Sequence, residues 1–301
     1  MRVAAGDIGT NSTRLLIAEV AGGRVIPRQR RVVVTGLGIG VDRTGCLAEE
    51  AVDRTLEVLA VFGETARAAG VAALRMVATA AVRAAVGNRE TFLDRAEAAL
   101  GVRPEVISGP EEAVLSFEGA TGGIAGPAPY LVIDVGGGST EFVFGSASPD
   151  SVDSIDLGSR RMTERYLPAL PCSSAQLAAA RRAAAEAFAG VALPGVPGTV
   201  VGVGGTYTAL GAIALGLAVY DPARVHGSVV SLPALDALAD RLARMTLEEM
   251  AALPSLDPAR APVLLGGAVV SAEALRRSGR GEVVVSEADL LDGIARRLAE
   301  A

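Results

Sequence analysis

The chain is 301 residues long, with 50% hydrophobic residues, 21% charged residues and 36 glycines. This composition excludes a disordered protein, and the length is enough for two domains with sizeable cores. A formal net charge of −6 excludes general attraction to nucleic acid or anionic membranes, and the absence of lysine excludes mechanisms that need a Schiff-base or P-loop lysine.

Short β-branched runs alternate with alanine-rich segments along the chain, which is typical of an α/β fold. The first three strands are expected to form an antiparallel meander around the Gly22-Gly23 turn. An amphipathic helix and then alternating strands and helices are expected to follow. The expected strands lie at 3–5, 12–20, 24–34, 74–78 and 105–107, and the expected helices begin near Ala48 and Pro110 and span 89–100.

A stretch at 121–129 (TGGIAGPAP) is uncharged and rich in glycine and proline, so it is the best candidate for a domain boundary. We expect an N-terminal domain over residues 1–126 and a C-terminal domain over residues 127–301. The second domain is expected to contain buried strands at 130–135 and 199–203, a helix from about Tyr207, and a last helix at about 288–298 that is a candidate for packing back on the first domain.

The cysteines, the N-terminus and one uncharged stretch indicate where in the cell the protein is located. Cys46 and Cys172 lie far apart and form neither a CxxC motif nor a metal-ligand spacing, which favours reduced thiols. The N-terminus lacks the apolar core of a signal peptide. Residues 190–220 carry no charge, but prolines and glycines interrupt the run, so no membrane-spanning helix is expected. We therefore expect a soluble cytoplasmic protein.

The two expected domains begin alike. Residues 7–13 read DIGTNST and residues 134–140 read DVGGGST, with Asp, Gly, Ser and Thr in the same register. Each motif follows one apolar strand and precedes another. This internal repeat predicts two related halves, each beginning with a hairpin that has a glycine-rich tip.

Both glycine-rich tips are candidates for binding phosphate, because glycine lets successive backbone N–H groups turn towards one point and the neighbouring side chains add donors. Tight hairpins capped by Asp and Ser are the alternative explanation. The candidate phosphate-binding residues are Gly9, Thr10, Asn11, Ser12, Gly136, Gly137, Gly138, Ser139 and Thr140.

Three carboxylates accompany these tips. Asp7 and Asp134 sit at strand ends, and Glu141 comes directly after the second tip. Carboxylate oxygens suit Mg²⁺ or its bound waters, so these three residues are candidate metal ligands.

A third glycine cluster, VGVGGTYTAL, ends a strand and begins a helix. The N–H groups at a helix N-terminus favour an anion, which makes Gly204, Gly205 and Thr206 candidates for phosphate or nucleotide binding. An ordinary strand–helix turn has the same pattern, and both explanations stay open.

These motifs, together with VATAAVR, ISGPEEAVLSFEGA and LPSLDPARAPVLLGGAVV, resemble the exopolyphosphatase / guanosine pentaphosphate phosphohydrolase family. The resemblance runs in order from about Val3 to the C-terminus. It implies two duplicated actin-like (ribonuclease H-like) domains with a cleft between them, Mg²⁺ or Mn²⁺ as cofactor, and a homodimer. The chain departs from the family at Gly6, where a bulkier residue is usual and the first strand is expected to loosen.

The ISGPEEA segment carries the expected catalytic carboxylate. Ser108 and Glu111 have the spacing of a helix capping box, which leaves Glu112 available for the cleft. The resemblance implies that Glu112 orients the attacking water, and that Arg83 in VATAAVR lies at the phosphate site.

Without lysine, any side-chain cation at phosphate has to be arginine, whose planar fork matches phosphate oxygens. Arg14 follows Thr13 on the same strand, so its side chain points to the opposite face from that of Thr13. The sequence leaves open whether Arg14 faces the cleft or the surface. Arg160 and Arg161 are weaker candidates.

The sequence therefore predicts a Mg²⁺-dependent exopolyphosphatase that releases terminal orthophosphate from inorganic polyphosphate. The length of 301 residues leaves out the additional C-terminal domains of longer members, so short chains are expected to be favoured. Guanosine pentaphosphate is the alternative substrate. A small-molecule kinase and a non-catalytic nucleotide or polyphosphate sensor are more distant alternatives, and the four acids Asp7, Glu112, Asp134 and Glu141 argue against the sensor.

Overall fold

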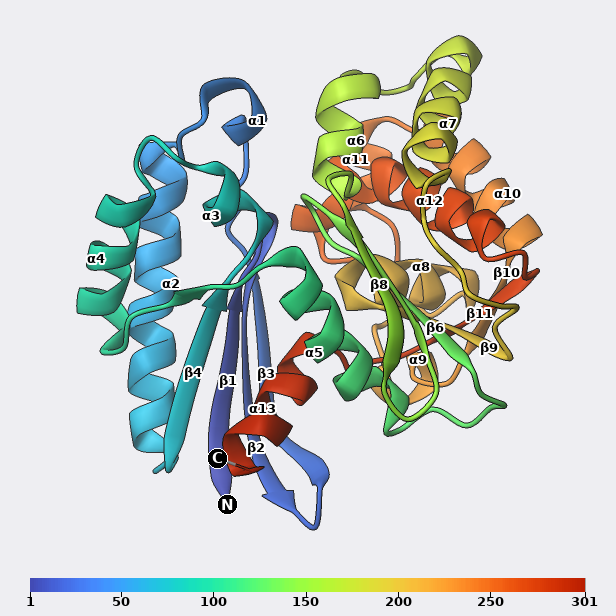
Figure 1. Cartoon of the computed structure of the whole chain (residues 1–301). Helices are drawn as coiled ribbons and strands as arrows, with labels where there is room; N and C mark the ends of the chain where they lie inside the picture. The colour runs from blue at the N-terminus through green and yellow to red at the C-terminus, as the bar shows by residue number, and fades with distance from the viewer. Residues whose placement is uncertain (301) are drawn as a thin grey trace. The chain divides into compact units, whose positions relative to one another are not determined.

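The computed structural model describes residues 1–300, which form two compact units (Figure 1). The first unit contains residues 1–122 and the C-terminal helix, and the second contains residues 123–289. The division lies inside the Gly/Pro-rich stretch at 121–129. No helix within residues 1–300 is long and apolar enough to cross a membrane.

The first unit is built on a five-stranded sheet in the order β3-β2-β1-β4-β5. The first three strands form an antiparallel meander, while β4 and β5 continue the sheet in parallel with β1. The strands are β1 (Arg2–Ile8), β2 (Ser12–Ala21), β3 (Arg24–Val34), β4 (Ala73–Ala78) and β5 (Glu105–Val106).

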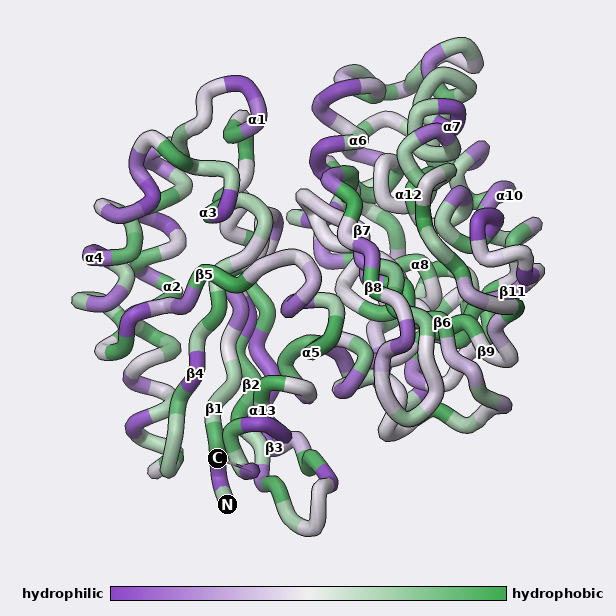
Figure 2. The backbone as a smooth tube through the Cα atoms, in the orientation of Figure 1, coloured by the Kyte–Doolittle hydropathy of each residue, from purple (hydrophilic) through white to green (hydrophobic). Residues whose placement is uncertain are grey.

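Strand alternation distributes the apolar side chains of β1 and β2 to both faces of this sheet. Ala4 and Ile8 pack with α2 and α4 on one face, whereas Val3 and Ala5 pack with α5 and α13 on the other. Figure 2 shows hydrophilic and hydrophobic stretches alternating along α2 and α4, as expected for helices with one face on a sheet. The helices are α1 (Val41–Thr44), α2 (Glu49–Ala68), α3 (Ala80–Ala84), α4 (Arg89–Leu100), α5 (Gly109–Thr121) and α13 (Leu290–Glu300).

Gly6 does not loosen the first strand as expected. It pairs with Leu15 on β2 and with Met76 on β4, so the strand is continuous. A Cβ atom at Gly6 would collide with the thioether of Met76. The flexible methionine therefore fills the space left by the small residue.

The second unit repeats this topology around a six-stranded sheet in the order β10-β11-β9-β6-β7-β8. Strands β6, β7 and β8 form an antiparallel meander, and β9 and then β11 lie parallel to β6. This repetition confirms the expected fold class of two duplicated α/β domains. The strands are β6 (Tyr130–Val135), β7 (Thr140–Gly145), β8 (Pro149–Ile155), β9 (Thr199–Val203), β10 (Val229–Ser231) and β11 (Glu282–Val285).

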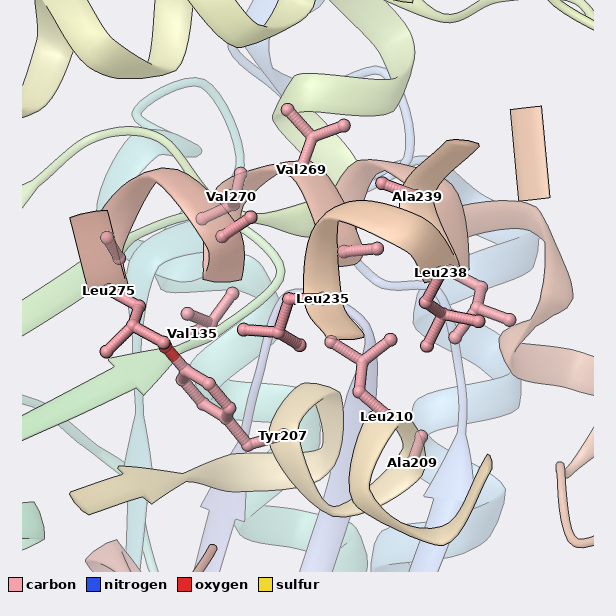
Figure 3. Close-up of a cluster of buried hydrophobic side chains, with 14 of the residues drawn as sticks. Val135, Tyr207, Ala209, Leu210, Leu235, Leu238, Ala239, Val269, Val270 and Leu275 are labelled. Carbon is pink, nitrogen blue, oxygen red and sulfur yellow. The ribbon is translucent and has the colours of Figure 1, made fainter. Parts of the chain in front are cut away.

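One large apolar core holds the second unit together. Figure 3 shows Tyr207 and Leu210 of α8 in the same cluster as Leu235 of α10 and Leu275 of α12. The helix expected from about Tyr207 begins earlier, at Gly204, which directly follows the last residue of β9. The helices are α6 (Ser159–Tyr166), α7 (Ser174–Phe188), α8 (Gly204–Ala214), α9 (Pro222–Val225), α10 (Leu232–Ala243), α11 (Leu247–Ala251), the 3₁₀ helix Pro258–Arg260 and α12 (Ala261–Arg277).

Candidate functional site

The first glycine-rich tip, called here the first turn, consists of residues 9–12 between β1 and β2. The amide of Gly9 donates to the carbonyl oxygen of Ser12 at 3.0 Å and closes the turn. Two amides that follow β3 donate to the carbonyl of Asn11 at 3.1 and 2.9 Å, and Gly38 N donates to the carbonyl of Thr10 at 2.8 Å. The segment after β3 therefore holds the carbonyl side of the turn.

The second turn, residues 136–139, repeats this geometry in the second unit. The amide of Gly136 donates to the carbonyl of Ser139 at 3.0 Å, the same bond at the same length. The first amides of α6 donate to the carbonyls of Gly136 and Gly137, at 2.9 Å each, and Arg161 Nη1 donates to the carbonyl of Gly138 at 2.8 Å.

Both turns therefore have their carbonyl oxygens held from one side. In a trans peptide the N–H group points opposite to the carbonyl of the same peptide unit. The N–H groups of Asn11 in the first turn, and of Gly137, Gly138 and Ser139 in the second, consequently point away from the segments that hold the carbonyls. Successive N–H groups arranged in this way form a concavity suited to anions.

The residues that flank the first turn form an ion pair. Asp7 and Arg14 lie directly opposite each other in the antiparallel register of β1 and β2. Arg14 Nη2 lies 2.8 Å and Nε 3.0 Å from Asp7 Oδ2, and both side chains are largely buried. Arg14, for which the sequence left cleft and surface open, is thus held against Asp7 inside the first unit.

The residues that flank the second turn are two acids. Asp134 and Glu141 occupy the positions equivalent to Asp7 and Arg14, opposite each other on β6 and β7. They are only 7% and 1% exposed. Glu141 Oε1 accepts a hydrogen bond of 2.8 Å from the hydroxyl of Ser154. Like charges opposite each other on neighbouring strands are destabilising, so this buried pair fits a cation with a preference for oxygen ligands.

A larger cluster of metal ligands is not found. Within residues 1–300, no three His, Cys, Asp or Glu side chains are grouped as a metal site. The expected ligands Asp134 and Glu141 are brought together on one sheet face, while Asp7 is placed beside Arg14 in the other unit.

Two adjacent glutamates at the start of α5 take different roles. The hydroxyl of Ser108 accepts a hydrogen bond from Glu111 N at 3.2 Å and caps the helix. The carboxylate of Glu111 pairs with Arg75 at 3.0 Å, so the structure forms only one side of the expected capping box. Glu112 is 9% exposed, and its Oε2 lies 2.8 Å from Nη1 of Arg83.

The Arg83–Glu112 pair is tied to the backbone of the first unit. Arg83 Nη1 also donates to the carbonyl of Ile107 at 3.0 Å, so one nitrogen spans the end of β5 and the start of α5. The structure therefore brings together the two residues that the sequence proposed as catalytic.

The carboxyl ends of the parallel strands gather these parts of the first unit at one sheet edge. The first turn follows β1, Arg83 lies on α3 after β4, and Ile107 follows β5. A Cβ atom at Gly38 would collide with Thr10 and would lie 3.2 Å from Ala81 Cβ, so the turn and α3 pack closely. Ligands of parallel α/β sheets bind at this edge.

The same edge of the second unit carries the third glycine cluster. Gly204 directly follows β9 and has a left-handed φ of 82°. A Cβ atom there would lie 2.7 Å from Asp134 Oδ1, so only glycine lets the carboxylate approach the start of α8. The guanidinium of Arg260 lies against Gly205, with Cζ 2.8 Å from the position of a Cβ atom.

The sequence reasoning missed the contact of Arg260 with the start of α8. Arg260 was visible only as part of the LPSLDPAR motif, and nothing local connects it to Gly205, which lies far away in the chain. Of the weaker arginine candidates, Arg161 binds the second turn through the carbonyl of Gly138 and pairs with Asp156 at 2.6 Å. Burial lowers the pKa of Arg160 from its ordinary value.

Comparison with known proteins places the chain among phosphatases. The model of the Ppx/GppA phosphatase family matches residues 16–300. Exopolyphosphatase 2 from Mycobacterium tuberculosis is 44% identical, and the match covers 99% of this chain and 98% of that protein.

Two crystal structures agree with that match. An exopolyphosphatase-like protein is 40% identical, with a TM-score of 0.92 over 99% of this chain and 100% of that one. A Ppx/GppA family member from Aquifex aeolicus is 29% identical, with a TM-score of 0.82 over 100% of this chain and 98% of that one.

Proposed function

Because this chain belongs to the Ppx/GppA phosphatase family, we propose that it is an exopolyphosphatase, which hydrolyses the terminal phosphoanhydride of inorganic polyphosphate and releases orthophosphate. The observation that carries the proposal is the position of Glu112. Arg83 holds its carboxylate at the sheet edge that also carries the first turn. A fixed carboxylate and a turn suited to anions on one edge are two of the parts that hydrolysis of a phosphoanhydride requires, beside a cation.

Glu112 is the proposed general base. Its carboxylate orients the attacking water and accepts a proton from it as the water oxygen bonds to the terminal phosphorus and the bridging P–O bond breaks. Arg83 fixes the direction of that carboxylate and contributes positive charge beside the phosphate.

The turns are the proposed phosphate-binding elements, because their N–H groups point away from the segments that hold their carbonyls. The side chains of Asn11, Ser12, Ser139 and Thr140, in or next to the turns, add hydroxyl and amide donors. The guanidinium of Arg260 lies against Gly205, where its positive charge favours binding of an anion at the start of α8. The proposed phosphate-binding residues remain Gly9, Thr10, Asn11, Ser12, Gly136, Gly137, Gly138, Ser139, Thr140, Gly204, Gly205 and Thr206.

Asp134 and Glu141 are the proposed holders of Mg²⁺ or Mn²⁺. Mg²⁺ in phosphoryl-transfer sites is commonly bound by one or two carboxylates and by phosphate oxygens, whose charge it offsets. Asp7, the third metal ligand expected from the sequence, is untested as a ligand and is not part of this proposed metal site, because Arg14 occupies its Oδ2 atom.

Guanosine pentaphosphate is the second candidate substrate, because it presents a terminal phosphoanhydride to the same carboxylate. A cytoplasmic location agrees with the free thiols of Cys46 and Cys172. The homodimer and the preference for short chains stay predictions.

The proposal is tested by incubating the purified protein with Mg²⁺ and either polyphosphates of defined length or guanosine pentaphosphate, and by following released orthophosphate. Release from polyphosphate that stops on chelation supports the proposal. Turnover of guanosine pentaphosphate alone would establish the second candidate. Transfer of phosphate from ATP to an added sugar or carboxylate, with no hydrolysis of either substrate, would indicate a kinase instead.

A further inference from the structure

The internal duplication allows the two turns to be compared position by position. Residues 7–14 correspond to residues 134–141 without insertion, and the same 3.0 Å hydrogen bond closes each turn. Asp7 pairs with Arg14 in the register of one hairpin, and Asp134 pairs with Glu141 in the register of the other. Arg14 therefore occupies the position that Glu141 occupies in the second unit.

This exchange reverses the electrostatics at one position. The first pair is neutral as a whole, because the guanidinium of Arg14 contacts Asp7 Oδ2 through two nitrogens at 2.8 and 3.0 Å. The second pair carries two negative charges when both acids are ionised, and Asp134 and Glu141 are 7% and 1% exposed. Buried charges are tolerated when an opposite charge compensates them.

We propose that Arg14 is a positioning residue that does for the first turn what a divalent cation does for the second. Its guanidinium holds Asp7 and supplies the permanent positive charge that compensates the Asp7 carboxylate. The chain therefore takes its divalent cation at Asp134 and Glu141 and not at Asp7. This inference rests on the proposed function in assigning a cation to the second turn, and it adds that the two turns compensate their aspartates by different means.

The test uses Mn²⁺ alone as the probe, without polyphosphate, and measures bound Mn²⁺ by electron paramagnetic resonance or calorimetry. The wild-type protein is expected to bind Mn²⁺ at Asp134 and Glu141. The Glu141→Gln variant, which keeps an acceptor for Ser154, is expected to bind it at least about tenfold more weakly. The Asp7→Asn variant is expected to bind it as the wild type does. Equal weakening in both variants would overturn the proposal.

A gain of binding separates this role from a merely structural one. The Arg14→Glu variant gives the first turn the same two acids as the second, so it is expected to bind one additional Mn²⁺ ion. Its matched opposite, Glu141→Arg, is expected to lose the wild-type site. An Arg14→Glu protein that is folded by circular dichroism but binds no additional Mn²⁺ would contradict the proposal. If that variant does not fold, the comparison of Asp7→Asn with Glu141→Gln decides.

Failure of the inference can be distinguished from failure of the proposed function, because the readout is binding and not turnover. A protein that shows the expected Mn²⁺ stoichiometries but releases no orthophosphate would refute the exopolyphosphatase activity alone. A protein that hydrolyses polyphosphate but loses Mn²⁺ binding on Asp7→Asn substitution would refute the role of Arg14 alone.

Discussion

Nη1 of Arg83 donates to Glu112 at 2.8 Å and to the backbone carbonyl of Ile107 at 3.0 Å. The carboxylate is thus attached through one nitrogen to the end of β5, and its direction is fixed by the sheet. The neighbouring pair, Arg75 with Glu111, has a similar length of 3.0 Å, but its carboxylate is more exposed, at 38% against 11% for Glu112. The two pairs provide a matched comparison between a proposed catalytic carboxylate and an ordinary ion pair.

We expect the Arg83→Gln substitution to reduce kcat for polyphosphate hydrolysis roughly 100-fold, because a misplaced catalytic group loses much of its effect. The Arg75→Gln substitution should change kcat by less than about twofold, since its exposed partners Glu105 and Glu111 have no part in the proposed chemistry. Orthophosphate release at saturating substrate measures both. Similar losses in the two variants would mean that Arg83 has no special role.

The Gly204→Ala substitution tests the contact between Asp134 and the start of α8. A Cβ atom there would lie 2.7 Å from Asp134 Oδ1, and the φ of 82° is strained for alanine. Gly216, with a φ of 64° and no atom within 4 Å of the position that a Cβ atom would take, is the matched control. Both alanine variants should lose about 1 kcal/mol of unfolding free energy from the backbone, and only Gly204→Ala should also weaken Mn²⁺ binding. Urea denaturation and a Mn²⁺ titration measure the two effects; unchanged Mn²⁺ affinity would refute the contact's importance.

Removing Mg²⁺ with a chelator should reverse which of two proteins, the wild type or the Glu141→Gln variant, is more stable. In EDTA, Glu141→Gln should be more stable than the wild type by up to about 1 kcal/mol, because it removes one of two opposed carboxylates. With Mg²⁺ the wild type should gain more stability than the variant, since the ion binds the folded state. Thermal unfolding with and without Mg²⁺ measures this. The exposed Glu57→Gln substitution is the control, and its stability relative to the wild type should not depend on Mg²⁺. If Mg²⁺ stabilised all three proteins equally, Asp134 and Glu141 would not be the metal site.

Local sequence signals were sufficient for the hairpins and the cap of α5. The meander β1–β3, the strand at Tyr130–Val135 and the Ser108 cap follow from alternation, turn glycines and side-chain chemistry. Counting outward from the first turn also pairs position 7 with position 14. The Asp7–Arg14 contact could therefore have been predicted from the hairpin register, whereas the alternation of Arg14 with Thr13 did not indicate it.

Contacts between distant segments were beyond such signals. The sequence made the last helix a candidate for packing on the first domain, but it did not indicate the contacts: Arg30 pairs with Asp292 at a separation of 262 positions, and a Cβ atom at Gly293 would collide with the backbone of Leu115. The glycine cluster predicted a helix start, but near Tyr207 instead of Gly204, and nothing in the local pattern indicated that Asp134 Oδ1 lies against Gly204. These features result from packing and not from local propensity.

The most direct test of the exopolyphosphatase proposal compares Glu112→Gln with Glu111→Gln. Both replace a glutamate by its isosteric amide on neighbouring positions of α5, and circular dichroism and thermal unfolding check that both remain folded. We expect Glu112→Gln to lower kcat for Mg²⁺-dependent release of orthophosphate from short polyphosphate by about 10²–10⁴-fold, and Glu111→Gln to retain nearly full activity. Near-normal turnover by folded Glu112→Gln protein would contradict the account.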